Sequence, residues 1–214
     1  MNERAPIVLV VDDDDAVRQA LARLVRSAGY RVQAYRSASE FLQCPPLADC
    51  PACLILDVRM PELNGLDLQG RLNAAGASLP IIFITGHGDI AMTVRAMKAG
   101  ATDFLTKPFE DADLLRAVDT ALRNASQALE KRIEIESIRG RLARLTPRER
   151  EVLVLLVEGR LNKQAAYELG VAEKTIKVHR ARVMEKMEAH SLVELARAAD
   201  KAGMPPLPRQ AVAG

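Results

Sequence analysis

Short apolar runs alternate with segments of helical periodicity over the first 124 residues, and this alternation limits the possible fold more than any other feature. The run Ile7–Val11 is almost entirely β-branched, which is typical of a strand buried on both faces. Similar runs follow at residues 31–35, 54–57, 81–84 and 104–106. The helical segments 16–28 and 90–99 end at Gly29 and Gly100, where left-handed caps are expected. Five strands alternating with five helices predict a doubly wound parallel α/β domain over residues 1–124.

Acidic residues stand where two of these strands end. Asp12 and Asp13 close the first strand and Asp57 closes the third. In the strand order 2-1-3-4-5, a common one for such sheets, the first and third strands are neighbours, and ligands bind beyond their carboxyl ends. We therefore expect three carboxylates in one pocket, where like charges either raise a pKa or bind a cation such as Mg²⁺.

A hydroxyl and an ammonium follow at the ends of the last two strands. Thr85 ends the fourth strand, and Lys107 ends the fifth and is followed at once by Pro108. Both side chains can bind phosphoryl oxygens, and phosphoryl transfer needs positioning and charge stabilisation more than proton chemistry. Asp57 is then the expected nucleophile, attacking phosphorus directly as a carboxylate.

The motifs VVDDD, LDVRMPELNG, ITGHGD and DFLTKPF, in this order, resemble the receiver domain of two-component response regulators, closest to the FixJ-like group. The resemblance implies a flavodoxin-like, five-stranded fold in which Asp57 takes phosphate from a sensor histidine kinase. It also implies that Asp13, Asp57 and the backbone carbonyl of Arg59 hold Mg²⁺, with Asp12 assisting through water. A cis Lys107–Pro108 bond is implied as well.

The same resemblance suggests how phosphorylation is transmitted. Phosphate on Asp57 is expected to draw the Thr85 hydroxyl inward, so that Phe104 can turn into the vacated space; plain core packing is the alternative for Phe104. The remodelled surface, made by the fourth helix, fifth strand and fifth helix, is where active receivers dimerise. We further hypothesise that Arg59 and His87 tune the lifetime of the phosphate by gating water.

Beyond the first domain the chain is almost entirely helical. Residues 125–144 predict a long helical linker, whose apolar stripe either packs on its neighbours or forms a partner-binding coiled coil. Residues 145–203 begin with a Thr146–Glu149 capping box, and Gly159 and Gly170 divide them into four short helices. The tail, residues 204–214, is proline-rich and expected to be loose.

The segment LTPREREVLVLLVEGRLNKQAAYELGVAEKTIKVHRARVMEKM resembles the LuxR/NarL-type helix-turn-helix domain, with SLVELARAA as its fourth helix. A helix from Glu173 to Met187 presents basic and small apolar side chains on one face, which suits the major groove. A solvated basic surface is the alternative. The expected DNA contacts are Asn162, Lys163, Lys174, Thr175, Lys177, Val178, Ala181, Arg182 and Lys186.

Two features of this helical segment bear on its strength and assembly. Ala172 stands where the family usually has a Ser or Thr cap for the recognition helix, a loss of about 1 kcal/mol. Apolar positions of the last helix, Leu192, Leu195 and Ala199, are candidates for a dimer contact on DNA.

Composition excludes several other classes of protein. The net charge of +2 means that DNA contact must come from a local basic patch. No apolar run can span a bilayer and no signal-peptide pattern precedes the first strand, so we expect a cytoplasmic protein. Cys44, Cys50 and Cys53 lack a fourth ligand for zinc, and Cys53 is expected to pack as a small hydrophobe.

The sequence thus predicts a DNA-binding response regulator rather than an enzyme. Its expected partners are a sensor histidine kinase, promoter DNA, a second copy after phosphorylation, and RNA polymerase. A phosphohydrolase with an aspartyl-phosphate intermediate is a rival, but Arg59 stands where the second catalytic aspartate would be. The other rival is a pseudo-receiver that binds DNA constitutively, and the intact Asp13, Asp57, Thr85 and Lys107 argue against it.

Overall fold

The computed structural model describes residues 5–44, 49–86 and 90–204. The chain divides into two compact units, an N-terminal unit, Met1–Glu130, and a C-terminal unit, Lys131–Gly214. The division falls within one continuous helix, Asp111–Ala143.

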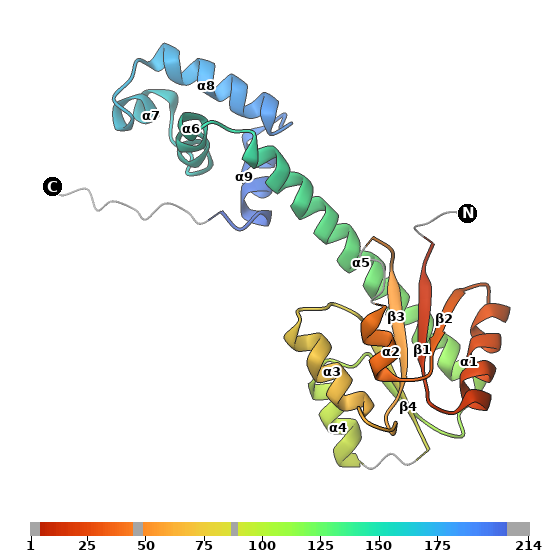
Figure 1. Ribbon diagram of the computed structural model, residues 1–214. Helices are drawn as coiled ribbons and strands as arrows, with labels where there is room; N and C mark the ends of the chain where they lie inside the picture. Colours follow the sequence, from red (N-terminus) through yellow and green to blue (C-terminus); the bar gives the residue numbers. More distant parts are fainter. Residues whose placement is uncertain (1–4, 45–48, 87–89, 205–214) are drawn as a thin grey trace. The chain divides into compact units, whose positions relative to one another are not determined.

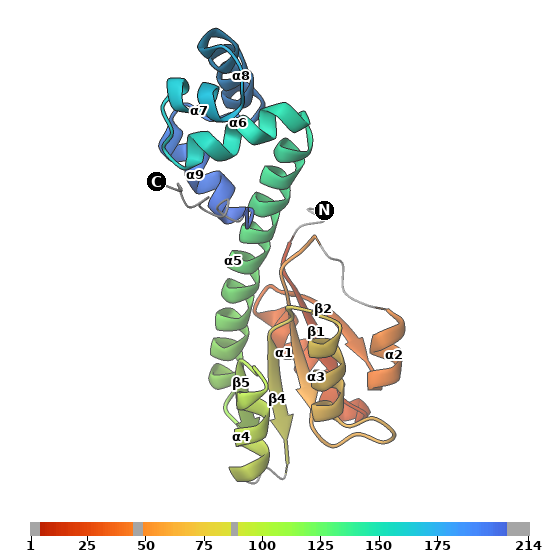
Figure 2. The same ribbon diagram turned by 90° about the vertical axis from the view of Figure 1, so that its left-hand side faces the viewer.

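A five-stranded parallel sheet forms the centre of the N-terminal unit (Figures 1 and 2). Its strands are β1 (Ile7–Val11), β2 (Arg31–Tyr35), β3 (Ala52–Asp57), β4 (Ile81–Thr85) and β5 (Asp103–Thr106). Their spatial order is β2-β1-β3-β4-β5, which confirms the predicted order 2-1-3-4-5. Because β1, β3 and β4 lie inside this order, their side chains are buried on both faces, as their apolar runs predicted.

Helices cover both faces of the sheet (Figure 1). They are α1 (Asp15–Ser27), α2 (Ala38–Gln43), α3 (Gly65–Ala74), α4 (Ile90–Lys98) and the first part of α5 (Asp111–Ala143). Buried residues of α1 and α5, such as Val25 and Val118, pack with Val8, Val10 and Ile55 on one face. The other face is covered by α2, α3 and α4. This is the doubly wound architecture that the sequence predicted.

Local signals explain where the first helix begins and ends. The Asp14 carboxylate accepts the backbone N–H groups of Ala16 (2.8 Å) and Val17 (3.2 Å), which caps the N-terminus of α1. Gly29 follows the helix with φ +89°, and Gly100 follows α4 with φ +92°. Both glycines adopt the left-handed conformation expected at a helix C-terminus.

The apolar stripe of α5 packs within the protein. Leu122 is buried in the core of the N-terminal unit, whereas Ile138 and Leu145, just beyond the helix end, are buried in the core of the C-terminal unit. These contacts support the packing alternative over a coiled coil for those positions.

Four further helices form the C-terminal unit, as predicted: α6 (Pro147–Val157), α7 (Asn162–Glu168), α8 (Glu173–Lys186) and α9 (Leu192–Lys201). Thr146 and Glu149 form the predicted capping box at the start of α6. Leu195 and Ala199 of α9 are only 0% and 3% exposed and belong to this unit's own core. Their side chains are therefore not available for the expected dimer contact on DNA, whereas Leu192 is only partly buried and its part in that contact stays a prediction. The predicted loose tail lies, from residue 205 on, outside the described residues.

The three cysteines are free thiols in the structure. Cys53 is fully buried in β3, where burial raises the pKa of its thiol to about 12, and Cys50 is also buried while Cys44 is exposed. Cys53 therefore packs as a small hydrophobe, as predicted. Among the residues that the structure describes, no helix is long and apolar enough to cross a membrane.

Candidate functional sites

The strand register brings the predicted acidic and basic residues to one edge of the sheet. Val11 pairs with Leu56, so Asp12 and Asp57 follow at the same level on neighbouring strands. Thr85 pairs with Thr106, which places Lys107 one residue beyond that pair. The Lys107 N–H donates to the Thr85 carbonyl at 2.8 Å. The carboxyl ends of four strands thus meet in one site.

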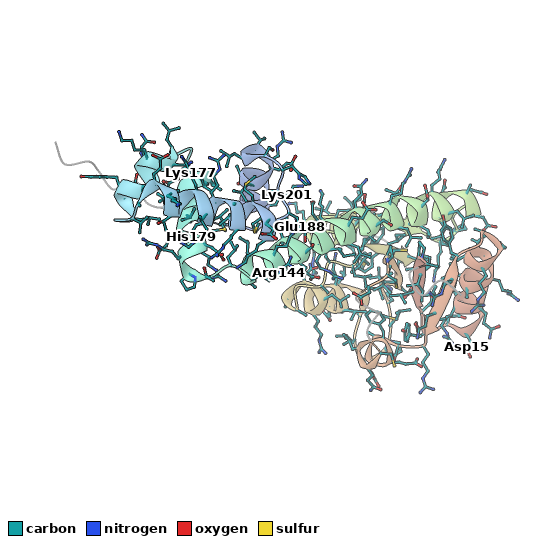
Figure 3. The ribbon with its side chains drawn as sticks, turned by 90° about the horizontal axis from the view of Figure 1, so that it is seen from above. Asp15, Arg144, Lys177, His179, Glu188 and Lys201 are labelled. Carbon is teal, nitrogen blue, oxygen red and sulfur yellow. The ribbon has the colours of Figure 1, made fainter. Side chains whose placement is uncertain are left out.

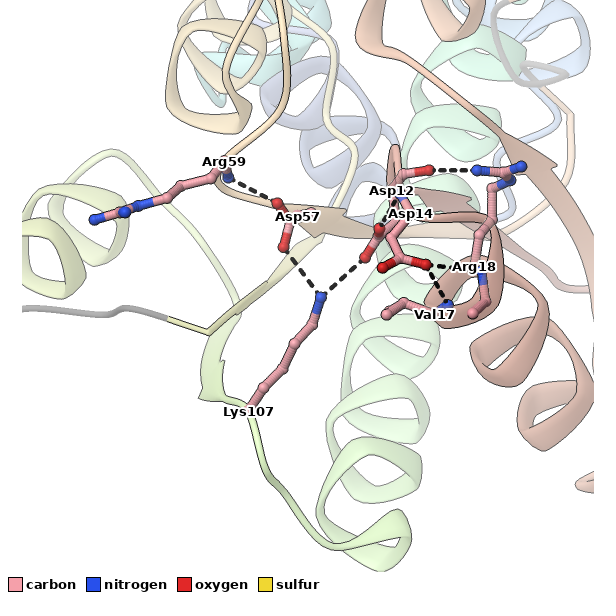
Figure 4. A network of polar contacts seen from close by, with 8 residues as sticks. Asp12, Asp14, Val17, Arg18, Asp57, Arg59 and Lys107 are labelled. Atoms are coloured by element: carbon pink, nitrogen blue, oxygen red, sulfur yellow. Dashed lines mark hydrogen bonds and ion pairs between the residues drawn. The ribbon is translucent and has the colours of Figure 1, made fainter.

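Asp12, Asp57 and Lys107 form the centre of this site (Figure 4). The Lys107 Nζ lies 3.0 Å from Asp12 Oδ2 and 3.2 Å from Asp57 Oδ1. Asp12 is 1% exposed and Asp57 is 7% exposed, so the pair is largely removed from water. Two buried carboxylates share one ammonium, which leaves one uncompensated negative charge.

This arrangement shifts the acid-base behaviour of both partners. Burial raises the pKa of Asp57, and the nearby Asp12 carboxylate adds to the rise, while Lys107 acts in the opposite direction. Burial alone would lower the pKa of Lys107, but its hydrogen bond and charge interactions with the two carboxylates raise it instead. The site favours further positive charge near the two carboxylates.

Asp13 does not join the buried pair. Its side chain is exposed, and no three Asp, Glu, His or Cys side chains form a metal-binding group among the residues in the described ranges. The structure thus buries two of the three predicted carboxylates together, while Asp13 stays exposed and its part in cation binding stays a prediction. The backbone N–H of Arg59 donates to Asp57 Oδ2 at 2.8 Å, and the Arg59 side chain is exposed.

The remaining predicted residues of this site lie around it. Thr85 is 1% exposed at the end of β4. The ring of Phe104 is partly buried and lies 6.1 Å from the ring of Phe83, centroid to centroid. The Lys107–Pro108 bond is cis, as the resemblance implied. His87 lies outside the described residues.

Gly65 also supports the site, although the sequence analysis gave it no role. A Cβ at this position would overlap the main-chain oxygen of Asp57 and lie 3.1 Å from both Leu56 Cγ and Phe83 Cε1. The start of α3 can therefore lie against the end of β3 only because residue 65 has no side chain. A glycine directly after the helix-capping Asn64 is the sequence signal that could have revealed this contact.

A second candidate site lies on α8 of the C-terminal unit. Ile176, Val183 and Met187 are buried in the core, as predicted. The opposite face of the helix carries the predicted DNA contacts, all exposed: Lys174, Thr175, Lys177, Val178, Ala181 and Arg182. Figure 3 shows Lys177 on this face, where its Nζ lies 3.1 Å from Glu173 Oε1. Ala172 precedes the helix with no side-chain cap, as the sequence indicated.

Helix α7, which precedes α8 in the helix-turn-helix, is held against α8 by a polar contact. Asn162, at the start of α7, accepts a hydrogen bond from Arg180 Nη1 through its Oδ1 at 3.3 Å, while Lys163 is exposed. Arg180 was not among the predicted residues, because its contact with Asn162 depends on how α7 and α8 pack.

Lys186 has a different environment from the one predicted. Its Nζ lies 2.6 Å from Oε2 of Glu149, which is 2% exposed, and 3.3 Å from the carbonyl oxygen of Arg144. This ion pair gives Lys186 a structural role between α8 and α6, and its predicted contact with DNA stays a prediction. Glu188, two residues further on, pairs with two arginines: its Oε1 lies 3.4 Å from Arg144 Nη2 and its Oε2 lies 3.5 Å from Arg141 Nη1. Glu188 and Arg144 are labelled in Figure 3.

Comparisons with known proteins match both units. Residues 8–119 match the model of the response regulator receiver domain, and residues 143–199 match that of the bacterial regulatory proteins of the luxR family. The chain is 48% identical to response regulator protein TmoT of Ectopseudomonas mendocina, covering 94% of this chain and 91% of that protein. It is 48% identical to transcriptional regulatory protein FixJ of Azorhizobium caulinodans, covering 96% and 97%. The solved structure of response regulator StyR is 46% identical, with a TM-score of 0.84 and coverage of 92% and 99%.

Proposed function

The chain belongs to the response regulator family, and we propose on this basis that phosphorylation of Asp57 by a sensor histidine kinase controls the binding of its helix α8 to promoter DNA. The observation that carries the proposal is the buried pair of Asp12 and Asp57, whose carboxylates lie 3.0 and 3.2 Å from the Nζ of Lys107. We keep the predicted division into a receiver domain (1–124), a helical linker (125–144), a DNA-binding domain (145–203) and a tail (204–214) as part of this proposal.

Asp57 is the proposed phosphoryl acceptor. Its carboxylate attacks phosphorus, an O–P bond forms, and the P–N bond to the kinase histidine breaks as that imidazole leaves. Lys107 stands within reach of both carboxylates, so its ammonium can move from Asp57 to a phosphoryl oxygen when the acyl phosphate forms. No side chain of this unit has to transfer a proton for the step.

The donor set fits Mg²⁺. The two buried carboxylates carry one more negative charge than Lys107 neutralises, and Mg²⁺ binds through one or two carboxylates while keeping several waters. We propose that Asp13, Asp57 and the Arg59 carbonyl hold the ion, with Asp12 assisting through water. When bound, the ion would neutralise charge on the phosphoryl oxygens.

Thr85 and Phe104 form the proposed relay from the phosphate to the surface. Thr85 is buried at the strand end next to Asp57, and Phe104 is only partly buried against Phe83. The Thr85 hydroxyl would bind the new phosphoryl group, and the Phe104 ring would turn inward. The surface of α4, β5 and α5 would then pair with a second copy of the chain.

The exposed face of α8 is the proposed DNA-reading surface. Lys174, Lys177 and Arg182 carry positive charge toward phosphates or guanine edges, and Val178 and Ala181 can contact a thymine methyl. Asn162, Lys163 and Thr175 complete the proposed contacts. Two such helices in a dimer would bind two half-sites and raise affinity, and the complex would activate transcription through RNA polymerase.

A direct experiment tests the phosphoryl acceptor. Acetyl phosphate with Mg²⁺ is expected to shift the wild-type chain on a phosphate-affinity gel, and Asp57→Asn is expected to show no shift. Asp49→Asn, which changes an exposed acidic residue of the same unit, is the matched control and should shift like wild type. A shift in Asp57→Asn, or none in wild type, would remove the proposed chemistry. Turnover of a generic phosphate ester would instead favour the phosphohydrolase.

A further inference from the structure

Every polar group of Asp12 has a partner, and one of these partners is the side chain of Arg18 (Figure 4). The Asp12 N–H donates to the Tyr35 carbonyl at 3.3 Å. Its carboxylate accepts the Asp14 N–H at Oδ1 (2.9 Å) and Lys107 Nζ at Oδ2 (3.0 Å). Its main-chain oxygen accepts Arg18 Nη1 at 2.8 Å.

The Asp12 carbonyl needs this donor because of where β1 ends. The last residue of β1, Val11, is paired with Tyr35 on one side and Leu56 on the other. Directly after it the chain leaves the sheet for α1, so the next carbonyl is left beyond the ladder. Arg18, in the first turns of α1, reaches back and donates to it. A buried main-chain oxygen without a partner would cost about 1–3 kcal/mol.

Arg18 is itself held in place at two points. Its Nη1 donates to the Asp12 carbonyl, and its Nη2 forms an ion pair with Asp15 in the first turn of the same helix. The Arg18 side chain is 15% exposed, although it carries a charge. A planar guanidinium bound at two points fixes its partners more rigidly than a single flexible donor would.

We propose that Arg18 is a positioning residue for the cation site of the receiver domain. It would hold the turn between β1 and α1, and thereby the directions in which the Asp12 and Asp13 carboxylates point. This inference rests on the proposed function, in which those carboxylates take part in binding Mg²⁺. Removing groups that orient metal ligands lowers metal affinity by about 10–100-fold.

A purely electrostatic role for Arg18 would have the opposite effect. A guanidinium next to a cation site repels the cation, so removing its charge would tighten Mg²⁺ binding. A purely structural role would lower the melting temperature and leave the affinity for Mg²⁺ unchanged. Measuring both quantities on the same variants separates the three roles.

The experiment is a titration of the full-length chain with MgCl₂ at constant ionic strength, followed by ¹⁵N NMR, with melting temperatures recorded without Mg²⁺. Arg18→Met is expected to raise the Kd for Mg²⁺ by about tenfold or more. Arg18→Lys keeps the charge and a donor nitrogen but not the planar fork, and it should recover part of the affinity. Arg23→Met removes the same charge from an exposed position of the same helix and should leave the Kd within about twofold of wild type.

The outcomes also separate this inference from the proposed function. If wild type binds Mg²⁺ and Arg18→Met has the same or a lower Kd, the positioning role alone is overturned. A wild-type chain that does not bind Mg²⁺ would overturn both proposals. If Arg18→Met does not fold, Arg18→Gln replaces it, since its side chain is too short to reach the Asp12 carbonyl, and the same rise in Kd is expected.

Discussion

The Nζ of Lys186 lies 2.6 Å from Oε2 of Glu149, so the last turn of α8 is tied to the first turn of α6. The carboxylate is 2% exposed and also accepts the backbone N–H of Thr146 at 2.9 Å. The end of the proposed DNA-reading helix is therefore fixed by an ion pair to a buried carboxylate and not by apolar packing alone.

This ion pair should make stability depend on pH. The hydrogen bond from Lys186 and then that from Thr146 lower the pKa of Glu149 from 4.5 to about 2. Because the pKa is lower in the folded state, the stabilisation is complete above about pH 5 and is lost as the pH falls toward 2. We expect Glu149→Gln to unfold more easily than wild type at pH 7 in urea, and the difference to disappear near pH 2. A difference that does not change with pH would contradict this role for the carboxylate.

Removing the other partner gives a second test of the same pair. Lys186→Met leaves the Glu149 carboxylate buried without its cation and should lower the free energy of unfolding by about 2 kcal/mol. Lys201→Met is the control, because Lys201 also forms an ion pair, with Glu134 at 2.6 Å, but both of its partners are about half exposed. That change should cost less than about 1 kcal/mol.

Asp57→Asn should stabilise the receiver domain. Burial raises the pKa of Asp57, so the folded state disfavours the charged form of this carboxyl. The free energy of unfolding therefore falls as the pH rises from the pKa of the unfolded chain through the higher pKa of the folded chain. The neutral amide avoids this loss. We expect a higher melting temperature than wild type at pH 7, and a difference that shrinks below about pH 4, where both forms are uncharged. A lower melting temperature at pH 7 would show that the pairing with Lys107 outweighs the burial of the charge.

Gly65→Ala should disturb the site by pushing on the backbone of Asp57. The new Cβ would overlap the Asp57 carbonyl, and we expect a loss of about 1–3 kcal/mol and slower phosphorylation by acetyl phosphate. Gly70→Ala, in the same helix, meets no atom within 4 Å and should be neutral or stabilising by up to about 1 kcal/mol. Equal unfolding curves for the two variants would mean that the close approach at residue 65 is unimportant.

The exposed cations of α8 should govern DNA affinity. Lys174→Ala and Arg182→Ala should each weaken binding, and the variant that loses a phosphate contact should lower the slope of log K against log salt by about 1. Lys201→Ala, outside α8, should change neither quantity. Fluorescence anisotropy at several salt concentrations measures both. Unchanged slopes and affinities in the two α8 variants would leave their basic face as a solvated surface.

Elements that a local sequence pattern determines could be predicted from the sequence. The β-branched run Ile7–Val11 and the glycines after α1 and α4 predicted strands and helix ends, because burial and backbone conformation act through neighbouring residues. The meeting of Asp12, Asp57 and Lys107 followed from strand order, since parallel strands end at the same edge of the sheet.

Contacts that depend on packing could not be predicted in this way. Lys186 resembles any exposed lysine of a basic helix, and only the packing of α8 against α6 brings it to Glu149. Likewise, the side chain of Arg18 returns to a main-chain carbonyl, which carries no sequence signal. Asp13 was expected in one pocket with Asp12 and Asp57, but only those two are buried, while Asp13 is exposed.

The most direct test of the account measures promoter affinity with and without acetyl phosphate in the presence of Mg²⁺, for wild type and Asp57→Asn. We predict that phosphodonor raises the affinity of wild type by roughly tenfold or more, a typical size for coupling between two sites, and leaves Asp57→Asn unchanged. An equal response of the two proteins, or no response in a wild-type chain shown to be phosphorylated, would contradict the claim that Asp57 controls the α8 helix.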